Sequence, residues 1–140
     1  MSFHEKSAWV MSLILTIAGA GYFASVWWVS EPGQLFASPS ISLLIFYVVS
    51  VVVLAIVGQV IIAAMAPKEA GHPADEREKT IAGRANSAGF YFLSTGAVIS
   101  LGLYLATHDA GIMFYILFLS LMVSQIASYV TQIVYFRRGM

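Results

Sequence analysis

The sequence of 140 residues contains no cysteine and few charged residues. The absence of cysteine excludes disulfides, thiolate metal sites, iron–sulfur clusters and cysteine nucleophiles. Charged residues make up 10% of the chain and hydrophobic residues 59%, whereas about 25% of the residues of a soluble globular domain are charged. Seven Lys and Arg balance seven Asp and Glu, so a basic surface for direct nucleic-acid binding is not expected. This composition favours an integral membrane protein.

Four long apolar runs without a charged residue occupy residues 8–29, 41–66, 88–106 and 111–136. A helix rises about 1.5 Å per residue, so about 20 residues cross a hydrocarbon core of about 30 Å. Helices are expected because backbone polar groups cannot stay unpaired in lipid. Ser38 followed by Pro39 has the chemistry of a helix start, and Asp109 that of a helix cap. The sequence predicts an all-α membrane protein with one domain (residues 1–140), a four-transmembrane-helix bundle of two antiparallel hairpins.

The basic residues predict how this bundle is oriented. All seven lie before the first run, in the loop 67–87 or after the fourth run: Lys6, Lys68, Arg77, Lys79, Arg84, Arg137 and Arg138. The segments on the other side of the predicted membrane carry only Glu31 and Asp109 as charged residues. Because basic residues stay on the cytoplasmic side, both termini and the loop 67–87 are expected in the cytoplasm.

The loop 67–87 is the one substantial polar segment. Asp75 and Glu76 suit the first turn of a helix, and Asp75 is spaced to pair with Lys79. This helix is expected to continue into the third span. Arg77 and Arg84 are seven residues apart and therefore share a helix face. Two interpretations remain open: an interfacial helix whose Arg residues meet anionic lipid headgroups, or a docking surface for a cytosolic protein or a second copy, with Asp75, Glu76, Arg77 and Arg84 as the candidate residues.

The order of residues around this loop carries a resemblance. Asp75-Glu76-Arg77-Glu78, then Ile81 and Arg84-Ala85, precede the aromatic Phe90-Tyr91-Phe92, and the chain starts with Glu-Lys-Ser-Ala-Trp at residues 5–9. This pattern resembles a family of small, uncharacterised bacterial four-helix integral membrane proteins. The resemblance implies a bacterial cytoplasmic (inner) membrane. Members are often found beside a helix-turn-helix regulator, which implies a cytosolic regulator as a partner.

None of the four runs contains Asp, Glu, Lys, Arg or His. A proton-coupled exporter needs an intramembrane carboxylate, a membrane b-type cytochrome needs His ligands in its helices, and a retinal protein needs a buried Lys. These classes are therefore excluded, and neither a cofactor nor an enzymatic activity is expected. His4 and His72 are predicted on one side and His108 on the other. His72 with Asp75 and Glu76 is the one metal-like cluster, and the alternative is a solvated loop.

Uncharged polar residues form a candidate intramembrane face. Gln125, Ser128 and Gln132 share one side of the fourth run, and Gln59 lies at a similar depth in the second. The second and fourth helices are therefore expected to meet there, either through interhelical hydrogen bonds or around a cavity for a lipid-like or polar small molecule.

Small residues repeat every four positions in three rows, which suit close helix packing. The rows are Gly21 with Ser25, Gly96 with Ser100, and Ser120 with Ser124 and Ser128. They are expected to pack inside the bundle or, alternatively, to form a homodimer interface.

Three classes of function follow. The first is a non-enzymatic membrane protein that acts through its cytoplasmic loop, as a sensor or accessory partner. The second is a homo-oligomeric channel, carrier or small-molecule-binding protein that uses the Gln/Ser/Thr face. The third, an enzyme, would have to rely on His72, Glu76 and Glu78, which have no visible enclosing pocket.

Overall fold

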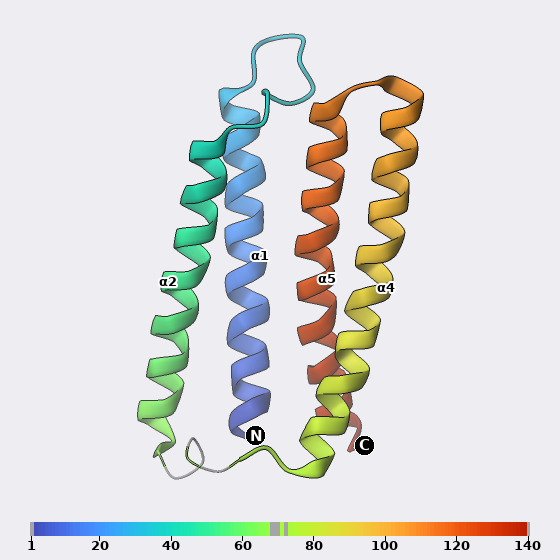
Figure 1. The fold of residues 1–140 in the computed structure, drawn as a ribbon. Coiled ribbons are helices and arrows are strands. Elements are labelled where there is room, and N and C mark those ends of the chain that lie inside the picture. Colours follow the sequence, from blue (N-terminus) through green and yellow to red (C-terminus); the bar gives the residue numbers. More distant parts are fainter. Residues whose placement is uncertain (1, 68–70, 72, 140) are drawn as a thin grey trace.

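The computed structural model describes residues 2–67, 71 and 73–139, which form four long helices (Figure 1). In chain order these are α1 (Phe3–Val29), α2 (Ile41–Met65), α4 (Glu76–Thr107) and α5 (Ala110–Arg138). Each is long and apolar enough to cross a membrane. The predicted all-α class is thus confirmed, as are four helices that are long and apolar enough to span a membrane.

The four helices lie side by side in the order α2, α1, α5, α4 (Figure 1). α1 packs against both α2 and α5, and α5 also packs against α4. Figure 1 shows consecutive helices pointing in opposite directions. The start of α1, the end of α2, the start of α4 and the end of α5 therefore lie at one end of the molecule, called the base below. The loop 30–40 and the corner 107–110 lie at the opposite end, called the top.

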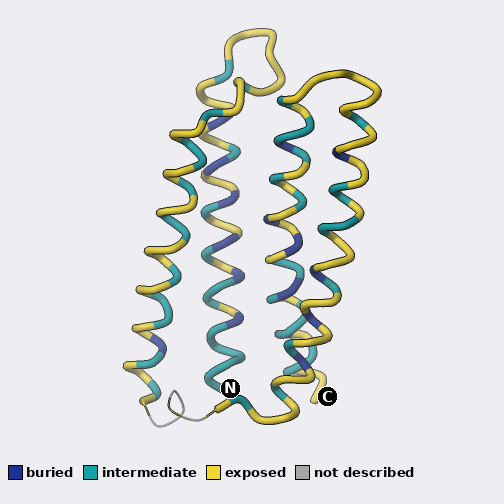
Figure 2. Tube along the Cα trace, viewed as in Figure 1, coloured by how far each residue is buried: buried dark blue, intermediate teal, exposed yellow. Residues whose placement is uncertain are grey.

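Burial is unequal between the helices. α1 and α5 carry buried residues along most of their length, whereas Ile62 is the one buried residue of α2 (Figure 2). α2 is nevertheless apolar on all sides. In water such a helix would need to be covered, but in a bilayer the lipid covers it. The exposure of α2 is therefore consistent with a membrane span at the edge of the helix row.

Aromatic residues fill the core of the upper half. Tyr22, Val26, Tyr115 and Met122 form a buried cluster between α1 and α5. The ring of Tyr47 on α2 lies 5.2 Å from that of Phe118 on α5, centroid to centroid. This contact brings α2 close to α5 near the top.

Small residues bring α4 and α5 together. A Cβ atom added at Gly89 would lie 2.8 Å from the carbonyl oxygen of Ser124 and would also collide with Ser128. A Cβ atom at Gly96 would collide with Ser120. The hydroxyl of the buried Ser100 donates to the carbonyl oxygen of Met113 at 2.7 Å.

Two of the three predicted small-residue rows thus pack inside the bundle as expected. The row of Gly21 and Ser25 does not, because a Cβ atom at Gly21 would meet no atom within 4 Å and Ser25 is exposed.

Helix boundaries differ from the sequence prediction at two starts. α1 begins at Phe3 rather than at residue 8, since Ser2 accepts a hydrogen bond from the backbone N–H of Glu5. The expected start of the second helix at Ser38 and Pro39 is wrong, because α2 begins only at Ile41. Asp109 caps α5 as predicted.

Candidate functional site

The charged start of α4 is held by a reciprocal cap. An Oδ1 atom of Asp75 accepts from the backbone N–H of Glu76 at 2.7 Å, and Glu78 accepts from the backbone N–H of Asp75 at 3.1 Å. This capping box satisfies N–H groups that lack partners at a helix start. From here α4 runs without interruption to Thr107, which confirms the predicted continuity of the loop helix with the third span. Asp75 therefore has a structural role in starting α4.

Arg77 and Arg84 line one recess at the base, on the side of α4 that meets α5. Its volume is about 300 Å³, and its walls are Glu76, Arg77, Thr80, Ile81, Arg84 and Tyr135. Ile81 is buried and supplies an apolar wall, whereas both arginines are exposed. Three of the four predicted docking residues thus lie around one hollow, which we call the Arg recess.

Charge in the Arg recess is predominantly positive. The carboxylate of Glu76 is 2.8 Å from the ammonium group of Lys79, one turn further along α4. The predicted pairing of Lys79 with Asp75 is replaced by this pair. The other two charged groups that line the recess are the guanidinium groups of Arg77 and Arg84.

The first turns of α1 connect to all three other helices near the base. The Nε2 atom of His4 lies 3.6 Å from an Oε2 atom of Glu78 on α4. The guanidinium carbon of Arg137, on α5, lies 5.2 Å from the centre of the Trp9 ring. The amide of Gln59 on α2 donates to the hydroxyl of Ser7 at 2.7 Å. These contacts connect the start of α1 to α4, α5 and α2 at the base.

The four residues of the predicted intramembrane face do not come together. Gln59 reaches Ser7 on α1 rather than α5. Ser128 is buried against Gly89, Gln132 is half-buried, and Gln125 is exposed on the side of α5. The second and fourth helices were expected to meet at this depth, but their ring contact, Tyr47 with Phe118, lies nearer the top. Gln59 is thus hydrogen-bonded to α1, whereas Ser128 packs against α4.

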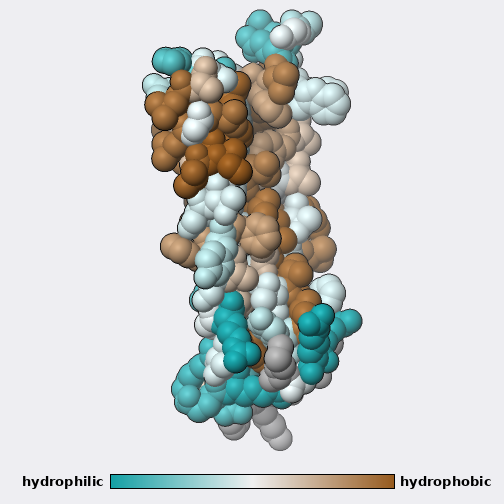
Figure 3. Space-filling view, turned by 90° about the vertical axis from the view of Figure 1, so that its right-hand side faces the viewer, coloured by the Kyte–Doolittle hydropathy of each residue, from teal (hydrophilic) through white to brown (hydrophobic). Residues whose placement is uncertain are grey.

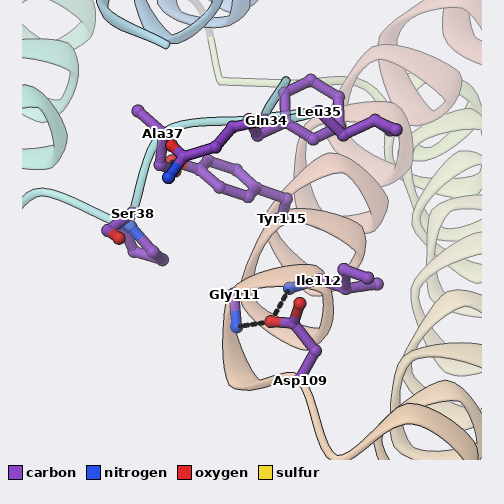
Figure 4. A pocket seen from close by; sticks show the side chains of 10 residues that line it. Gln34, Leu35, Ala37, Ser38, Asp109, Gly111, Ile112 and Tyr115 are labelled. Atoms are coloured by element: carbon purple, nitrogen blue, oxygen red, sulfur yellow. Dashed lines mark hydrogen bonds between the residues drawn. The ribbon is translucent and has the colours of Figure 1, made fainter. Parts of the chain in front are cut away.

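A second hollow lies at the top, between the loop after α1 and the start of α5 (Figure 4). It measures about 380 Å³. The carboxylate of Asp109 lies at its edge and accepts from the backbone N–H groups of Gly111 and Ile112 at 2.8 and 3.2 Å. The hydroxyl of Tyr115 donates to the carbonyl oxygen of Ala37 at 2.8 Å. These polar groups hold the loop and cap the helix.

The predicted metal-like cluster of His72, Asp75 and Glu76 includes one residue, His72, that lies outside the described residues. Lys68 also lies outside them. Within the described part of the chain, no group of three or more His, Asp or Glu side chains is placed to hold a metal ion. His108 has a left-handed backbone conformation and ends α4.

Three residues that line the recess lie outside the predicted docking set: Thr80, Ile81 and Tyr135. Tyr135 is the one that comes from another helix. The corner 107–110 is short, so two residues that are the same number of positions before and after it lie opposite each other on α4 and α5. This register places Gly89 opposite Ser128 and Gly96 opposite Ser120. The same counting from the corner places Tyr135 beside Ile81, and it could have identified Tyr135 in advance.

Comparison of the chain with family models, with curated proteins and with solved structures gave no match. The resemblance to small bacterial four-helix membrane proteins therefore stays a prediction.

Proposed function

We propose that this chain is a non-enzymatic multi-pass protein of a bacterial cytoplasmic membrane, and that it acts through its base as a sensor or accessory partner of a cytosolic regulator protein. In this proposal the helices cross the membrane as two antiparallel hairpins with both termini in the cytoplasm. The Arg recess and the charged start of α4 form the docking surface.

The observation that carries this proposal is the length of α4. The helix has 32 residues, which correspond to about 48 Å at about 1.5 Å per residue, whereas the hydrocarbon core is about 30 Å thick. The charged residues of α4 lie in its first turns, at the base, so the excess length is expected to project there. Seen from the α4 side, hydrophilic residues gather at the base, a smaller hydrophilic group lies at the top, and hydrophobic and intermediate residues lie between them (Figure 3).

The distribution of charge supports the orientation. All basic residues of the described chain lie in α1 before Trp9, in the first turns of α4 or in the last turn of α5. Glu31 and Asp109 are the charged residues near the top. The base therefore corresponds to the cytoplasmic side by the distribution of basic residues.

The proposal is tested by measuring which proteins stay bound to the chain after basic residues at the base are replaced by acidic ones. In the native cell, chemical cross-linking followed by affinity purification and quantitative mass spectrometry would compare Arg77→Glu with Arg84→Glu against Lys6→Glu with Arg138→Glu. Both double variants change the charge by the same amount, but only the first changes residues that line the Arg recess. We expect a cytosolic protein to be lost from the first variant and kept by the second. Unchanged retention of every partner by the first variant contradicts the docking surface.

A homo-oligomeric channel or carrier is the second candidate, and the exposure of Gln125 favours it. Gln125 lies near the middle of α5, at hydrocarbon depth, and its side chain has no hydrogen-bond partner within the described residues. An amide in lipid gains from a partner on another helix. Solute flux into liposomes should fall on Gln125→Leu with Gln132→Leu if this class is right, and unchanged flux counts against it.

A further inference from the structure

A hollow lies between the upper halves of α1 and α2, where Gly21 and Ser25 stay uncovered. Its volume is about 190 Å³. The residues that carry its chemistry come from both helices: Gly21, Tyr22 and Ser25 on α1, and Phe46, Tyr47 and Ser50 on α2. We propose that this hollow, called the α1–α2 hollow below, binds the ring of a lipid-soluble quinone, with a carbonyl group of the quinone accepting a hydrogen bond from Tyr22.

The hydroxyl of Tyr22 is a buried donor without an acceptor. Tyr22 is 5% exposed, and its hydroxyl has no hydrogen-bond partner among the described residues. Such a group is unfavourable, and the surrounding hydrocarbon offers it no acceptor. A ligand that brings a carbonyl oxygen into the α1–α2 hollow supplies the missing partner.

The other hydroxyls of the hollow differ in what they can offer. Tyr47 and Ser50 bring two hydroxyls from the α2 wall, opposite Tyr22. The hydroxyl of Ser25 already donates to the carbonyl oxygen of Gly21 at 2.8 Å, within α1. The donors for a ligand therefore come from both helices, which suits a ring with carbonyl groups on opposite edges.

The walls of the hollow suit a flat ring on an apolar tail. The rings of Tyr22 and Tyr47 lie 5.6 Å apart, centroid to centroid, and Phe46 adds a third ring that is 72% exposed. Aromatic rings attract other flat rings through offset or edge contacts. Sites for drug-sized molecules measure about 300–1,000 Å³, so a hollow of about 190 Å³ holds only the head of a ligand. The rest of the ligand must extend past Phe46 into lipid, as an isoprenoid tail would.

The depth of the hollow favours a quinone over a phospholipid. α2 has 25 residues, which correspond to about 37 Å at about 1.5 Å per residue, whereas the hydrocarbon core is about 30 Å thick. Ser50 lies nine residues after Ile41, the first residue of α2, which corresponds to about 13 Å below the start of the helix. Even if the whole excess of about 7 Å projected at the top, Ser50 would lie about 6 Å inside the core. The ester carbonyls of phospholipids lie at the boundary of the core, whereas the ring of a quinone can enter it.

The quinone proposal concerns the purified chain and does not depend on a regulator. Its test is equilibrium dialysis of the full chain in lipid nanodiscs, with empty nanodiscs to subtract partitioning into lipid. The ligands are 2-methyl-1,4-naphthoquinone, 2-methylnaphthalene, which has the same carbon skeleton without carbonyls, and methyl oleate, a lipid ester. Because the chain contains no cysteine, the quinone cannot attach to a thiol.

Two pairs of variants separate the hollow from the rest of the protein. Gly21→Leu fills the hollow, and Gly102→Leu adds the same side chain to α4; a Cβ atom meets no atom within 4 Å at either position. Tyr22→Phe removes the unpaired hydroxyl, and Tyr91→Phe removes a hydroxyl from an exposed position on α4. The changes at Gly102 and Tyr91 are the matched controls.

The wild type should bind the quinone saturably and more tightly than 2-methylnaphthalene. Tyr22→Phe should weaken quinone binding roughly 2- to 10-fold and leave the binding of 2-methylnaphthalene unchanged. A hydrogen bond is lost only by a ligand that accepts it, so this difference separates a direct contact from a change in packing. Gly21→Leu should abolish saturable binding of both rings, and both controls should keep it. Since Tyr22→Phe removes a single hydroxyl, it keeps the test decisive even if Gly21→Leu unfolds.

Four results would overturn the inference. Equal quinone affinity in Tyr22→Phe and in the wild type would mean that the hydroxyl does not contact the ligand. Methyl oleate bound as tightly as the quinone would make the hollow a site for lipid esters. Saturable binding kept by Gly21→Leu would place the ligand elsewhere. Absence of saturable binding, with nanodiscs that hold two wild-type chains but one Gly21→Leu chain, would make the row of Gly21 and Ser25 a contact between two copies.

None of these results bears on partner retention in cells. Failure of the quinone proposal and failure of the regulator proposal can therefore be told apart.

Discussion

The substitution Gly89→Ala tests the packing that holds α4 against α5. The added Cβ atom would lie 2.8 Å from the backbone carbonyl oxygen of Ser124. A side chain could rotate away, but this oxygen belongs to the helix backbone, so the two helices must move apart. Overpacking of this kind lowers the free energy of unfolding by about 1–3 kcal/mol. We expect Gly89→Ala to fall in this range.

Gly102→Ala is the matched control on the same helix. A Cβ atom there would meet no atom within 4 Å. Alanine is a better helix former than glycine by about 0.5–1 kcal/mol in a helix interior, so the control should be neutral or slightly stabilising. The two variants add the same methyl group to the same helix. Any difference in the free energy of unfolding between them therefore reports the α4–α5 contact.

Reversible unfolding in mixed micelles, followed by circular dichroism, gives both free energies. The absence of cysteine allows single spin labels to be introduced on α4 and α5, and their separation should increase in Gly89→Ala. Equal stability of the two variants would refute the close approach at Gly89. A second check uses Gly96→Ala, whose collision with Ser120 should be relieved by the compensating change Ser120→Gly.

Three further predictions concern polar contacts between segments. Gln59→Leu and Ser7→Ala should couple by about 0.6–1.7 kcal/mol in a double-mutant cycle, because the two side chains share one hydrogen bond; additive effects would contradict the contact. Tyr115→Phe should lower the free energy of unfolding by about 0.5–1.5 kcal/mol, since it removes the hydrogen bond to the carbonyl oxygen of Ala37; unchanged stability would contradict this. Asp75→Ala should speed amide hydrogen exchange in the first turn of α4 and cost about 0.5–2 kcal/mol; protection equal to wild type would show that the capping box is dispensable.

Local sequence features predicted the helices because lipid acts as a uniform solvent. An apolar run long enough to cross the hydrocarbon core must form a helix there, whichever helix it packs against. Asp109 and Asp75 act within one turn of their own positions, so their caps could be recognised from neighbouring residues alone. The continuity of α4 from the charged loop into the third span followed from the same local pattern.

Partner choice between helices could not be predicted in the same way. Gln59 was grouped with Gln125 because the two lie at a similar depth, yet its partner is Ser7 on another helix. Depth is fixed by position in a span, but the direction of a side chain depends on which helices are neighbours. In the order α2, α1, α5, α4, the part of α2 that carries Gln59 faces α1. Gln59 and Gln125 are therefore separated, although they lie at a similar depth.

The sequence by itself determined the helical class, the four apolar segments long enough to span a membrane, and the segments that carry the charges of the base. Each of these depends on the composition of a single continuous segment. Only the tertiary structure decided that α2 lies at the edge, that Gln59 reaches Ser7 on α1, and that Gly21 has no neighbouring helix against it. Within lipid, apolar side chains gain little by choosing one apolar neighbour over another. Close packing of small residues and a few hydrogen bonds therefore select the arrangement, and these are properties of surfaces that meet, not of single segments.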